Sequence, residues 1–343
     1  MGSDKRVTMK DIGDRLGVSV CTVNKALTGK GRVSDETRKQ IIETAHKMGY
    51  HPNKLAQALT RKELTIGVAY PDVWPSYAQS LLAGLREGLQ DISDYNVIGR
   101  FLRIGNQSFA EELTRAVTWS GKDAFDTMVI IPYYEHFSST DWSSLAELGI
   151  PLALLGMDIP DAPRLFCVRQ DSMRCGRMAA ELLVKQAGAV KMAAIIGSRE
   201  VSEHREKADG FQEEASRLSA RLVGVYETLG DEDIAYPVAR RIFADHPDVR
   251  GLYVTTETIE GVCRYLSENG LAGTVKVVAT GALAEVKSAI DNDIVQFSLF
   301  QNMDRQGRQA IRLLYDYLIQ GINPSEDVLV APEIIVRGNL DLW

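Results

Sequence analysis

The chain has 343 residues, of which 45% are hydrophobic and 25% charged, and its formal net charge is −7. This length is sufficient for two or three domains with apolar cores. No apolar run approaches the roughly 18–20 residues of a membrane-spanning helix, and no apolar stretch near the N-terminus could act as a secretory signal. We therefore expect a cytoplasmic protein.

The charge is unevenly distributed along the chain. Residues 1–62 contain 13 Lys and Arg against 6 Asp and Glu, whereas the remaining residues contain 26 against 40. A basic end on an acidic body is the asymmetry expected when that end binds a polyanion. The alternative is an ordinary solvated basic surface.

The cysteine pattern argues against a metal or redox site. Cys21, Cys167, Cys175 and Cys263 are too widely spaced for a ligand pair or a redox pair. We expect free thiols on small buried or half-buried side chains, and we expect no metal and no cofactor.

Three short amphipathic helices are predicted in the first 50 residues, with Thr8, Ser19 and Ser34 as their N-caps. Their inner positions are Ile12, Leu16, Val23, Ala26, Leu27, Ile41, Ala45 and Met48. A two-residue turn sets the second helix across the first, which leaves its outer face uncovered: Val20, Cys21, Asn24 and Lys25. This is helix-turn-helix geometry, in which the second helix can enter the major groove of DNA.

Short polar or cationic side chains near the helix starts suit phosphate oxygens, and each is equally suited to be a plain cap or a solvated surface residue. They are Thr8, Ser19, Thr22, Arg32, Ser34 and Thr37.

After Pro52, residues 53–59 are predicted to form a short helix that is unstable alone and needs a partner.

The motifs VTMKDIG, GVSVCTVNK, VSDETR, GYHPN and AQAL resemble, nearly position by position, the head and hinge of the lac-repressor/galactose-repressor (LacI/GalR) family. The resemblance implies an all-α DNA-binding domain in residues 1–50, a hinge helix and linker in 51–63, and repression of transcription by a homodimer or a tetramer. By this resemblance, Val20, Cys21 and Lys25 read bases. Thr8, Ser19, Thr22, Asn24, Thr28 and Asn53 lie near the DNA backbone or groove, and Ala56 and Leu59 belong to a hinge helix in the minor groove.

An apolar wedge such as Leu59 from each of two chains can open a base step and kink the duplex; the alternative is an ordinary linker leucine.

Three departures from the family pattern stand out. Gly13 replaces the usual Ala, which should loosen the first helix slightly. Asn24 and Lys25 replace Ser and Arg, and a Lys makes a single-point contact where Arg could bind guanine bidentately. Val20 and Cys21 are small and mainly apolar, which favours contact with a thymine methyl group over hydrogen bonds.

From Leu64 onward, short apolar runs alternate with helical stretches, a pattern typical of parallel strands covered on both faces. The expected strands are residues 65–70, 96–104, 127–133, 151–156, 191–197, 221–228, 251–256, 276–281 and 294–300. Nine or ten strands are too many for one open sheet, so we expect two lobes with a break near residues 166–171. No glycine-rich phosphate loop follows any strand, which argues against a nucleotide-dependent enzyme.

This part resembles the two-lobed α/β effector domain, similar to type I periplasmic binding proteins, that follows the head in the same family. The resemblance implies an effector-binding domain in residues 64–343, with lobes at 64–166 and 167–300 and C-terminal crossovers in 301–343. It also implies a small-molecule ligand in the cleft at the carboxyl ends of the strands.

Loops after the strands supply the candidate effector residues, and the resemblance singles out Tyr77, Lys207 and Gln301. The full set is Asp72, Trp74, Tyr77, Asp171, His204, Lys207, Thr256, Glu257 and Gln301. An aromatic face beside polar groups suits a sugar. Thr255–Thr256 replaces the family's Asn-Asp, so a ligand-binding carboxylate is absent; Glu257 and Asp171 are the candidates to replace it. Asp171 could instead cap the next helix, and Trp74 could seal the cleft rim or a subunit contact.

The sequence therefore predicts a DNA-binding regulator, a repressor by resemblance, that binds a pseudo-palindromic operator and responds to a sugar. A nucleobase or a sugar phosphate is the alternative effector. A sugar-binding module without operator function is the rival from another class. An enzyme is the third option, and the absence of a nucleophile elbow, a metal-spaced His/Cys cluster or a P-loop argues against it.

Overall fold

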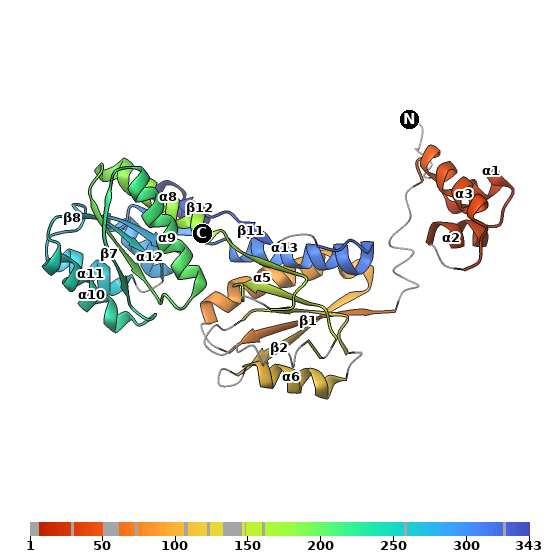
Figure 1. The fold of residues 1–343 in the computed structure, drawn as a ribbon, viewed down its shortest axis with the longest axis horizontal. Helices are drawn as coiled ribbons and strands as arrows, with labels where there is room; N and C mark the ends of the chain where they lie inside the picture. The colour runs from red at the N-terminus through yellow and green to blue at the C-terminus, as the bar shows by residue number, and fades with distance from the viewer. Residues whose placement is uncertain are drawn as a thin grey trace. The chain divides into compact units, whose positions relative to one another are not determined.

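The computed structural model describes residues 7–28, 31–50, 62–72, 75–105, 109–121, 124–132, 146–147, 149–159, 162–256, 259–324 and 327–343. The chain divides into two units, a head that ends at Lys62 and a body that begins at Glu63 (Figure 1). The predicted hinge, residues 51–63, lies almost entirely outside the described residues.

The head contains the three predicted helices, which are α1 (Met9–Leu16), α2 (Val20–Thr28) and α3 (Asp35–Lys47). Thr8 caps α1 through reciprocal hydrogen bonds with Asp11. Ser19 and Ser34 each accept a hydrogen bond from the backbone N–H three residues further on, at 3.1 and 3.2 Å. The three predicted N-caps are confirmed, and they fix where each helix starts.

The turn between α1 and α2 depends on two glycines. Gly17 has a φ of +67°, in the left-handed region that favours glycine, and it ends α1. The carbonyl oxygen of Gly13 accepts a hydrogen bond from the Val18 N–H at 3.0 Å, and a Cβ on Gly13 would lie 2.7 Å from the Val18 carbonyl oxygen. Gly13 therefore permits close packing of this turn, in addition to the expected loosening of the helix.

The core of the head is the one that the helical spacing predicts. Its fully buried side chains are Ile12, Val23, Ala26, Ile41 and Ala45. Leu16, Leu27 and Met48, also predicted to face inward, are half-buried against this core. The guanidinium of Arg38 donates to the Ala26 carbonyl oxygen at 3.3 Å, which ties α3 to α2.

The body contains two sheets, each of six strands in the described residues. The first has the order β11-β5-β4-β3-β1-β2, with β1 (Leu64–Pro71), β2 (Val97–Ile104), β3 (Thr127–Ile130), β4 (Leu152–Gly156), β5 (Phe166–Gln170) and β11 (Val328–Val330). The second has the order β12-β10-β9-β8-β6-β7, with β6 (Lys191–Ile196), β7 (Arg221–Glu227), β8 (Val249–Val254), β9 (Lys276–Thr280), β10 (Phe297–Phe300) and β12 (Glu333–Ile335).

The strand pairs are parallel except that of β10 with β12, which is antiparallel. All nine expected runs form strands. The expected total of nine or ten was too low, because β5, β11 and β12 were not recognised. The chain leaves the first sheet after Gln170, within the break expected near residues 166–171, whereas the lobe boundary at 166/167 falls inside β5, which pairs with β4.

Helices cover both faces of each sheet. In the first lobe, α5 (Pro75–Asp91) and α13 (Met303–Tyr315) lie on one face and α6 (Phe109–Ser120) on the other (Figure 1). The second lobe contains α8 (Ser172–Ala187), α9 (Ser202–Arg217), α10 (Glu232–Asp245), α11 (Glu260–Glu268) and α12 (Ala284–Asp291). Successive residues of β6 alternate between two cores: Ala193 and Ile195 pack toward α10, α11 and α12, whereas Met192 and Ala194 pack toward α8 and α9. This double coverage is why the strands are nearly continuous apolar runs.

The chain crosses between the lobes after β5, β10 and β11, and these crossovers are hydrogen-bonded to one another. The backbone N–H of Asp171 donates to the Val330 carbonyl oxygen at 3.0 Å. The Asn302 side-chain amide donates to the Ala331 carbonyl oxygen at 3.1 Å. Asn302 itself has a φ of +50°, which the sharp entry into α13 requires. The sequence-distant crossovers therefore form one polar junction.

Candidate functional site

The outer face of α2 is exposed, as predicted. Val20 is 45% exposed, and Cys21, Asn24 and Lys25 are also exposed, whereas Val23 on the opposite side is fully buried. The other three cysteines are buried and all four are free, so Cys21 departs from the expectation of buried or half-buried thiols. This face presents an ammonium group, an amide and two small side chains, a set that can contact the edges of bases.

The polar residues near the helix starts are engaged as caps. Thr8 Oγ1 donates to an Asp11 carboxylate oxygen at 2.6 Å, and the hydroxyl pairs Ser19–Thr22 and Ser34–Thr37 lie 2.9 and 2.7 Å apart. Their role as caps is thus observed, and contact with phosphates stays a prediction. Arg32 is exposed. The Thr28 side chain and the hinge residues Asn53, Ala56 and Leu59 lie outside the described residues.

In the body, two predicted effector residues meet at a buried ion pair. Lys207 is only 1% exposed, and its Nζ lies 2.8 Å from Glu203 Oε1. The side-chain amide of Gln301, at the crossover after β10, donates to the same Glu203 oxygen at 3.3 Å. We call Glu203, His204, Lys207, Thr256 and Gln301 the effector cluster.

The ion pair keeps both of its members charged. Burial raises the pKa of the Glu203 carboxyl, but the neighbouring Lys207 ammonium and its hydrogen bond lower it more, so that the net pKa is below the usual value. A lysine this deeply buried requires such a partner, because an isolated buried charge is too costly. The pair is therefore a fixed, electrically neutral group with donors and an acceptor.

His204 and Thr256 lie over the end of β6, where Gly197 leaves room for them. A Cβ on Gly197 would overlap the His204 ring and lie 3.1 Å from Thr256 Cγ2. His204 Nδ1 accepts a hydrogen bond from the Ser198 N–H at 3.1 Å, which places the remaining imidazole proton on Nε2. Burial, aided by the Lys207 charge, lowers the pKa of His204 to about 4. The neutral ring therefore has an N–H donor at neutral pH.

Two other predicted effector residues, Asp72 and Asp171, are engaged by partners outside this cluster. Asp72 pairs with Arg103 of β2. Asp171 caps α8, accepting from the Arg174 N–H at 3.0 Å and pairing with its guanidinium at 2.8 Å, so the capping alternative is the one observed. Trp74, Glu257 and the side chain of Tyr77 lie outside the described residues.

Two contacts of α9 were not recognised from the sequence. Glu203 lies four residues before Lys207, a spacing that places both on one helix face and could have indicated the pair. Arg169 of β5 forms an ion pair with Glu206 of α9 at 2.6 Å, which joins the first sheet to a helix of the second lobe. Because this ion pair joins the two lobes, its formation can depend on how the lobes are arranged.

Among the described residues, no helix is both long and apolar enough to span a membrane. The same residues contain no cluster of three or more His, Cys, Asp or Glu with a geometry for a metal ion.

Comparisons with known proteins agree with this architecture. Residues 8–53 match the family described as bacterial regulatory proteins, lacI family. Residues 144–322, more than half of the chain, match the periplasmic binding protein domain.

Similar full-length proteins include transcriptional regulators. HTH-type transcriptional regulator MalR of Streptococcus pneumoniae serotype 4 is 25% identical over 276 residues, which cover 77% of this chain and 81% of MalR. Catabolite control protein A of Priestia megaterium is 24% identical over 77% of this chain and 79% of its own length. The ribose operon repressor of Bacillus subtilis is 23% identical over 73% of each chain.

Solved structures show the same fold. A periplasmic ribose ABC transporter from Conexibacter woesei has a TM-score of 0.73 at 18% identity, covering 82% of this chain and 94% of that chain. A sugar-binding protein of a sugar ABC transporter from Bacillus halodurans has a TM-score of 0.71 at 19% identity, covering 81% and 99%. The body is therefore a two-lobed domain similar to type I periplasmic binding proteins.

Lys207→Met should lower the free energy of unfolding by about 3–5 kcal/mol, because it leaves the Glu203 carboxylate buried without its cation. Adding Glu203→Gln should recover much of this loss. Lys185→Met is a matched control, since it removes an exposed pair with Glu181 (3.0 Å, also four residues apart) and should cost about 1 kcal/mol or less. Urea denaturation of the wild-type protein, the two single variants and the double variant measures these free energies of unfolding. Equal losses for Lys207→Met and Lys185→Met would contradict the burial of the Lys207–Glu203 pair.

His204 should make the protein less stable in acid. Its pKa is about 4 in the folded chain against 6.5 for an ordinary histidine, so protonation favours the unfolded state. The stability is fully present above pH 6.5 and is lost as the pH falls toward 4. Glu203, with its lowered pKa, acts in the same direction at still lower pH.

Urea denaturation at stepped pH checks this expectation. His204→Gln should flatten the fall by on the order of 1–2 kcal/mol, after allowance for solvent screening of a half-buried ring. An unchanged slope in His204→Gln would contradict the inferred neutral ring.

Proposed function

The chain belongs to the LacI family of bacterial regulatory proteins, and on that premise we propose that it binds a pseudo-palindromic DNA operator as a dimer under the control of a small sugar. The observation that supports DNA binding best is the uncovered face of α2, held across α1 by the turn at Gly17. In this role α2 lies in the major groove, with one head on each half-site. The chain then acts in the cytoplasm, as a repressor.

The exposed residues of α2 make different contacts with DNA. Val20 and Cys21 are small and mainly apolar, which favours contact with a thymine methyl group. Lys25 offers a single ammonium to a base edge, and its aliphatic part lies near Gly31, where a Cβ would be 3.1 Å from Lys25 Cδ. Thr8, Ser19, Thr22, Asn24, Thr28, Arg32 and Asn53 position the head on the DNA backbone, while Ala56 and Leu59 act in the minor groove.

The effector cluster supports an uncharged ligand. Lys207 and Glu203 neutralise each other, His204 is neutral at physiological pH, and Gln301 and Thr256 carry no charge. Together they offer both donors and acceptors, which suits sugar hydroxyls. This favours a sugar over a sugar phosphate in the cleft. The ribose operon repressors and the sugar-binding proteins among the similar chains support the same ligand class.

The effector acts by favouring one arrangement of the two lobes. Gln301 lies on a crossover and contacts Glu203 of the second lobe, so a ligand at the cluster contacts both the crossover and α9. A 100-fold difference in affinity between two arrangements corresponds to about 2.7 kcal/mol, sufficient to alter operator occupancy. The paired hinge helices are the element that responds.

This function requires binding and no catalysis. The proposed cluster contains a histidine whose pKa is too low for a base near neutral pH. Turnover of a sugar by the purified protein would favour the enzyme reading. Sugar binding without any salt-dependent DNA binding would favour the recognition module instead.

Selection of duplexes from a random pool with the full-length protein tests the DNA interface. On the selected duplex, Lys25→Ala should cost about 1–3 kcal/mol and relax discrimination at one base position. Leu59→Ala should weaken binding and reduce the bend of the duplex. Lys47→Ala, an exposed lysine at the end of α3, is the control. Affinity that does not fall with salt, or equal binding by Lys25→Ala and Lys47→Ala, would count against this interface.

Melting curves against a panel of sugars, sugar phosphates and nucleobases test the effector site, because a ligand selective for the folded chain raises Tm. For the sugar that stabilises the wild-type protein, Gln301→Ala should weaken binding about tenfold or more and remove its effect on DNA affinity. Gln320→Ala, after α13, is the control. An undiminished shift in Gln301→Ala would show that the ligand binds elsewhere.

A further inference from the structure

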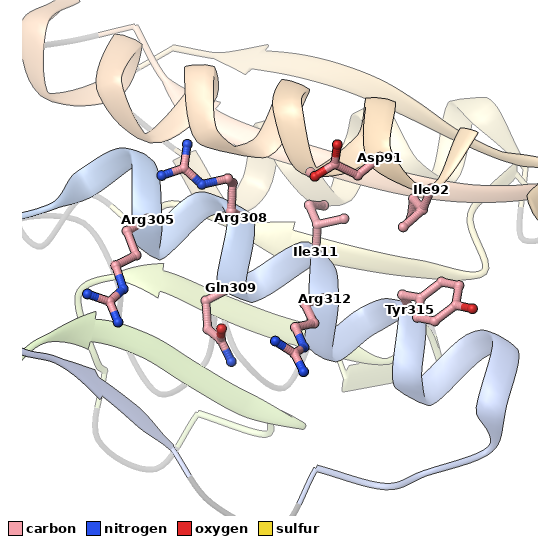
Figure 2. A pocket seen from close by; sticks show the side chains of 9 residues that line it. Asp91, Ile92, Arg305, Arg308, Gln309, Ile311, Arg312 and Tyr315 are labelled. Carbon is pink, nitrogen blue, oxygen red and sulfur yellow. The ribbon is translucent and has the colours of Figure 1, made fainter. Parts of the chain in front are cut away.

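A cavity of about 310 Å³ lies between α5 and α13, and none of its lining residues belongs to the effector cluster (Figure 2). Its floor is apolar, formed by Gly88, Ile92 and Ile311. Its polar lining includes three arginines of α13, which are Arg305, Arg308 and Arg312. Cavities of this size are typical of small-molecule sites.

The walls of the cavity are held rigidly by close helix packing. A Cβ on Gly307 would lie 2.5 Å from the Leu81 carbonyl oxygen, and a Cβ on Gly84 would overlap the backbone of Asp304. At the cavity itself, a Cβ on Gly88 would lie 2.9 Å from Ile311 Cβ. The two helices are therefore in contact through glycines, and the lining side chains project from a fixed backbone.

The three arginines of the lining differ in their ion-pair partners. Arg308 is held by Glu87 of α5 and by Asp304, the latter at 2.6 Å. Arg305 and Arg312 are exposed, and neither forms an ion pair within the described part of the chain. Asp91 is the one carboxylate that lines the cavity. Arg305 and Arg312 therefore have guanidinium donors that no carboxylate of the described residues engages in an ion pair.

The two arginines without ion pairs lie on one side of α13. Positions 305, 309 and 312 share a helix face, and in Figure 2 Arg305, Gln309 and Arg312 project from the same side, whereas Arg308 points toward α5. Two long cations and an amide that flank an apolar floor can bind a molecule with an anionic group at one end and a carbon skeleton at the other.

We propose that this cavity binds a small phosphate-bearing molecule. A phosphomonoester offers oxygens in several directions, so guanidinium groups from two turns of one helix can bind it with charge-assisted hydrogen bonds. Its carbon skeleton covers the floor at Ile92 and Ile311, and its phosphate oxygens accept from Arg305 and Arg312, which form no ion pair within the described part of the chain. The site is distinct from the effector cluster and does not depend on the function proposed for that cluster.

Calorimetric titration of the full-length protein with ribose 5-phosphate, ribose and inorganic phosphate tests the proposal. We expect ribose 5-phosphate to bind with a Kd below about 1 mM, and inorganic phosphate to compete with it more weakly. Arg305→Gln combined with Arg312→Gln should lose about tenfold or more in affinity, whereas Arg115→Gln, an exposed arginine of α6, should bind as the wild-type protein does. Gln309→Trp keeps both arginines but fills the cavity, and it should also block binding.

Three outcomes would overturn the proposal: no binding of ribose 5-phosphate, undiminished binding by the double arginine variant, or binding of a phosphoserine peptide in place of the small molecule. The second outcome would place the phosphate elsewhere, and the third would make this face a docking surface for a protein. Melting curves of each variant check that it is folded. Loss of this site would leave the sugar response and DNA binding intact, so its failure is distinguishable from failure of the proposed function.

Discussion

The buried ion pair between Lys207 and Glu203 is the interaction on which the arrangement of the body depends. A lysine at 1% exposure is tolerated only with a partner, because desolvation of an unpaired ammonium would cost more than one domain can supply. Glu203 provides that partner from the first turn of α9, one helical turn before Lys207. The same carboxylate also accepts from Gln301, so one charged pair fixes a helix and a crossover together.

The crossovers extend this constraint to the first lobe. The Gln306 amide on α13 donates to the Gln301 carbonyl oxygen at 2.8 Å, and Asn302 bonds the crossover after β11. Movement between the lobes must rearrange these polar contacts, while the apolar cores above each sheet stay intact. Hinges of this kind, a few residues at element ends that absorb backbone changes, are a common basis for domain closure. Because α13 begins at this junction and packs in the first lobe, a rearrangement of the junction can displace α13 and so affect the first lobe.

The sequence predicted best those features that depend only on residues close together in the chain. Capping residues at Thr8, Ser19 and Ser34 and continuous apolar runs identified the head and nine strands. The strand at Phe166–Gln170 was missed because FCVRQ is short and mixes apolar with polar residues, and β11 and β12 have only three residues each. Glu203 was missed because a Glu–Lys pair at this spacing is far more often an exposed helix pair. The cavity at Gly88 depends on the approach of two helices more than 200 residues apart in sequence, which no local pattern records.

The distribution of charge explains why a sugar and an anion would bind at different places on this chain. The effector cluster is already neutral, so an anionic ligand there would introduce an uncompensated buried charge, whereas a sugar would only exchange hydrogen bonds with water for hydrogen bonds with protein. On α13 the situation differs, because Arg305 and Arg312 are exposed to solvent and form no ion pair within the described residues. An anion bound there gains charge-assisted hydrogen bonds at little desolvation cost. α13 begins at Met303, and its N-cap Asn302 directly follows Gln301. A ligand on the cationic side of α13 therefore contacts the helix that leaves the effector cluster, and any difference in its affinity between lobe arrangements would reach the crossover directly.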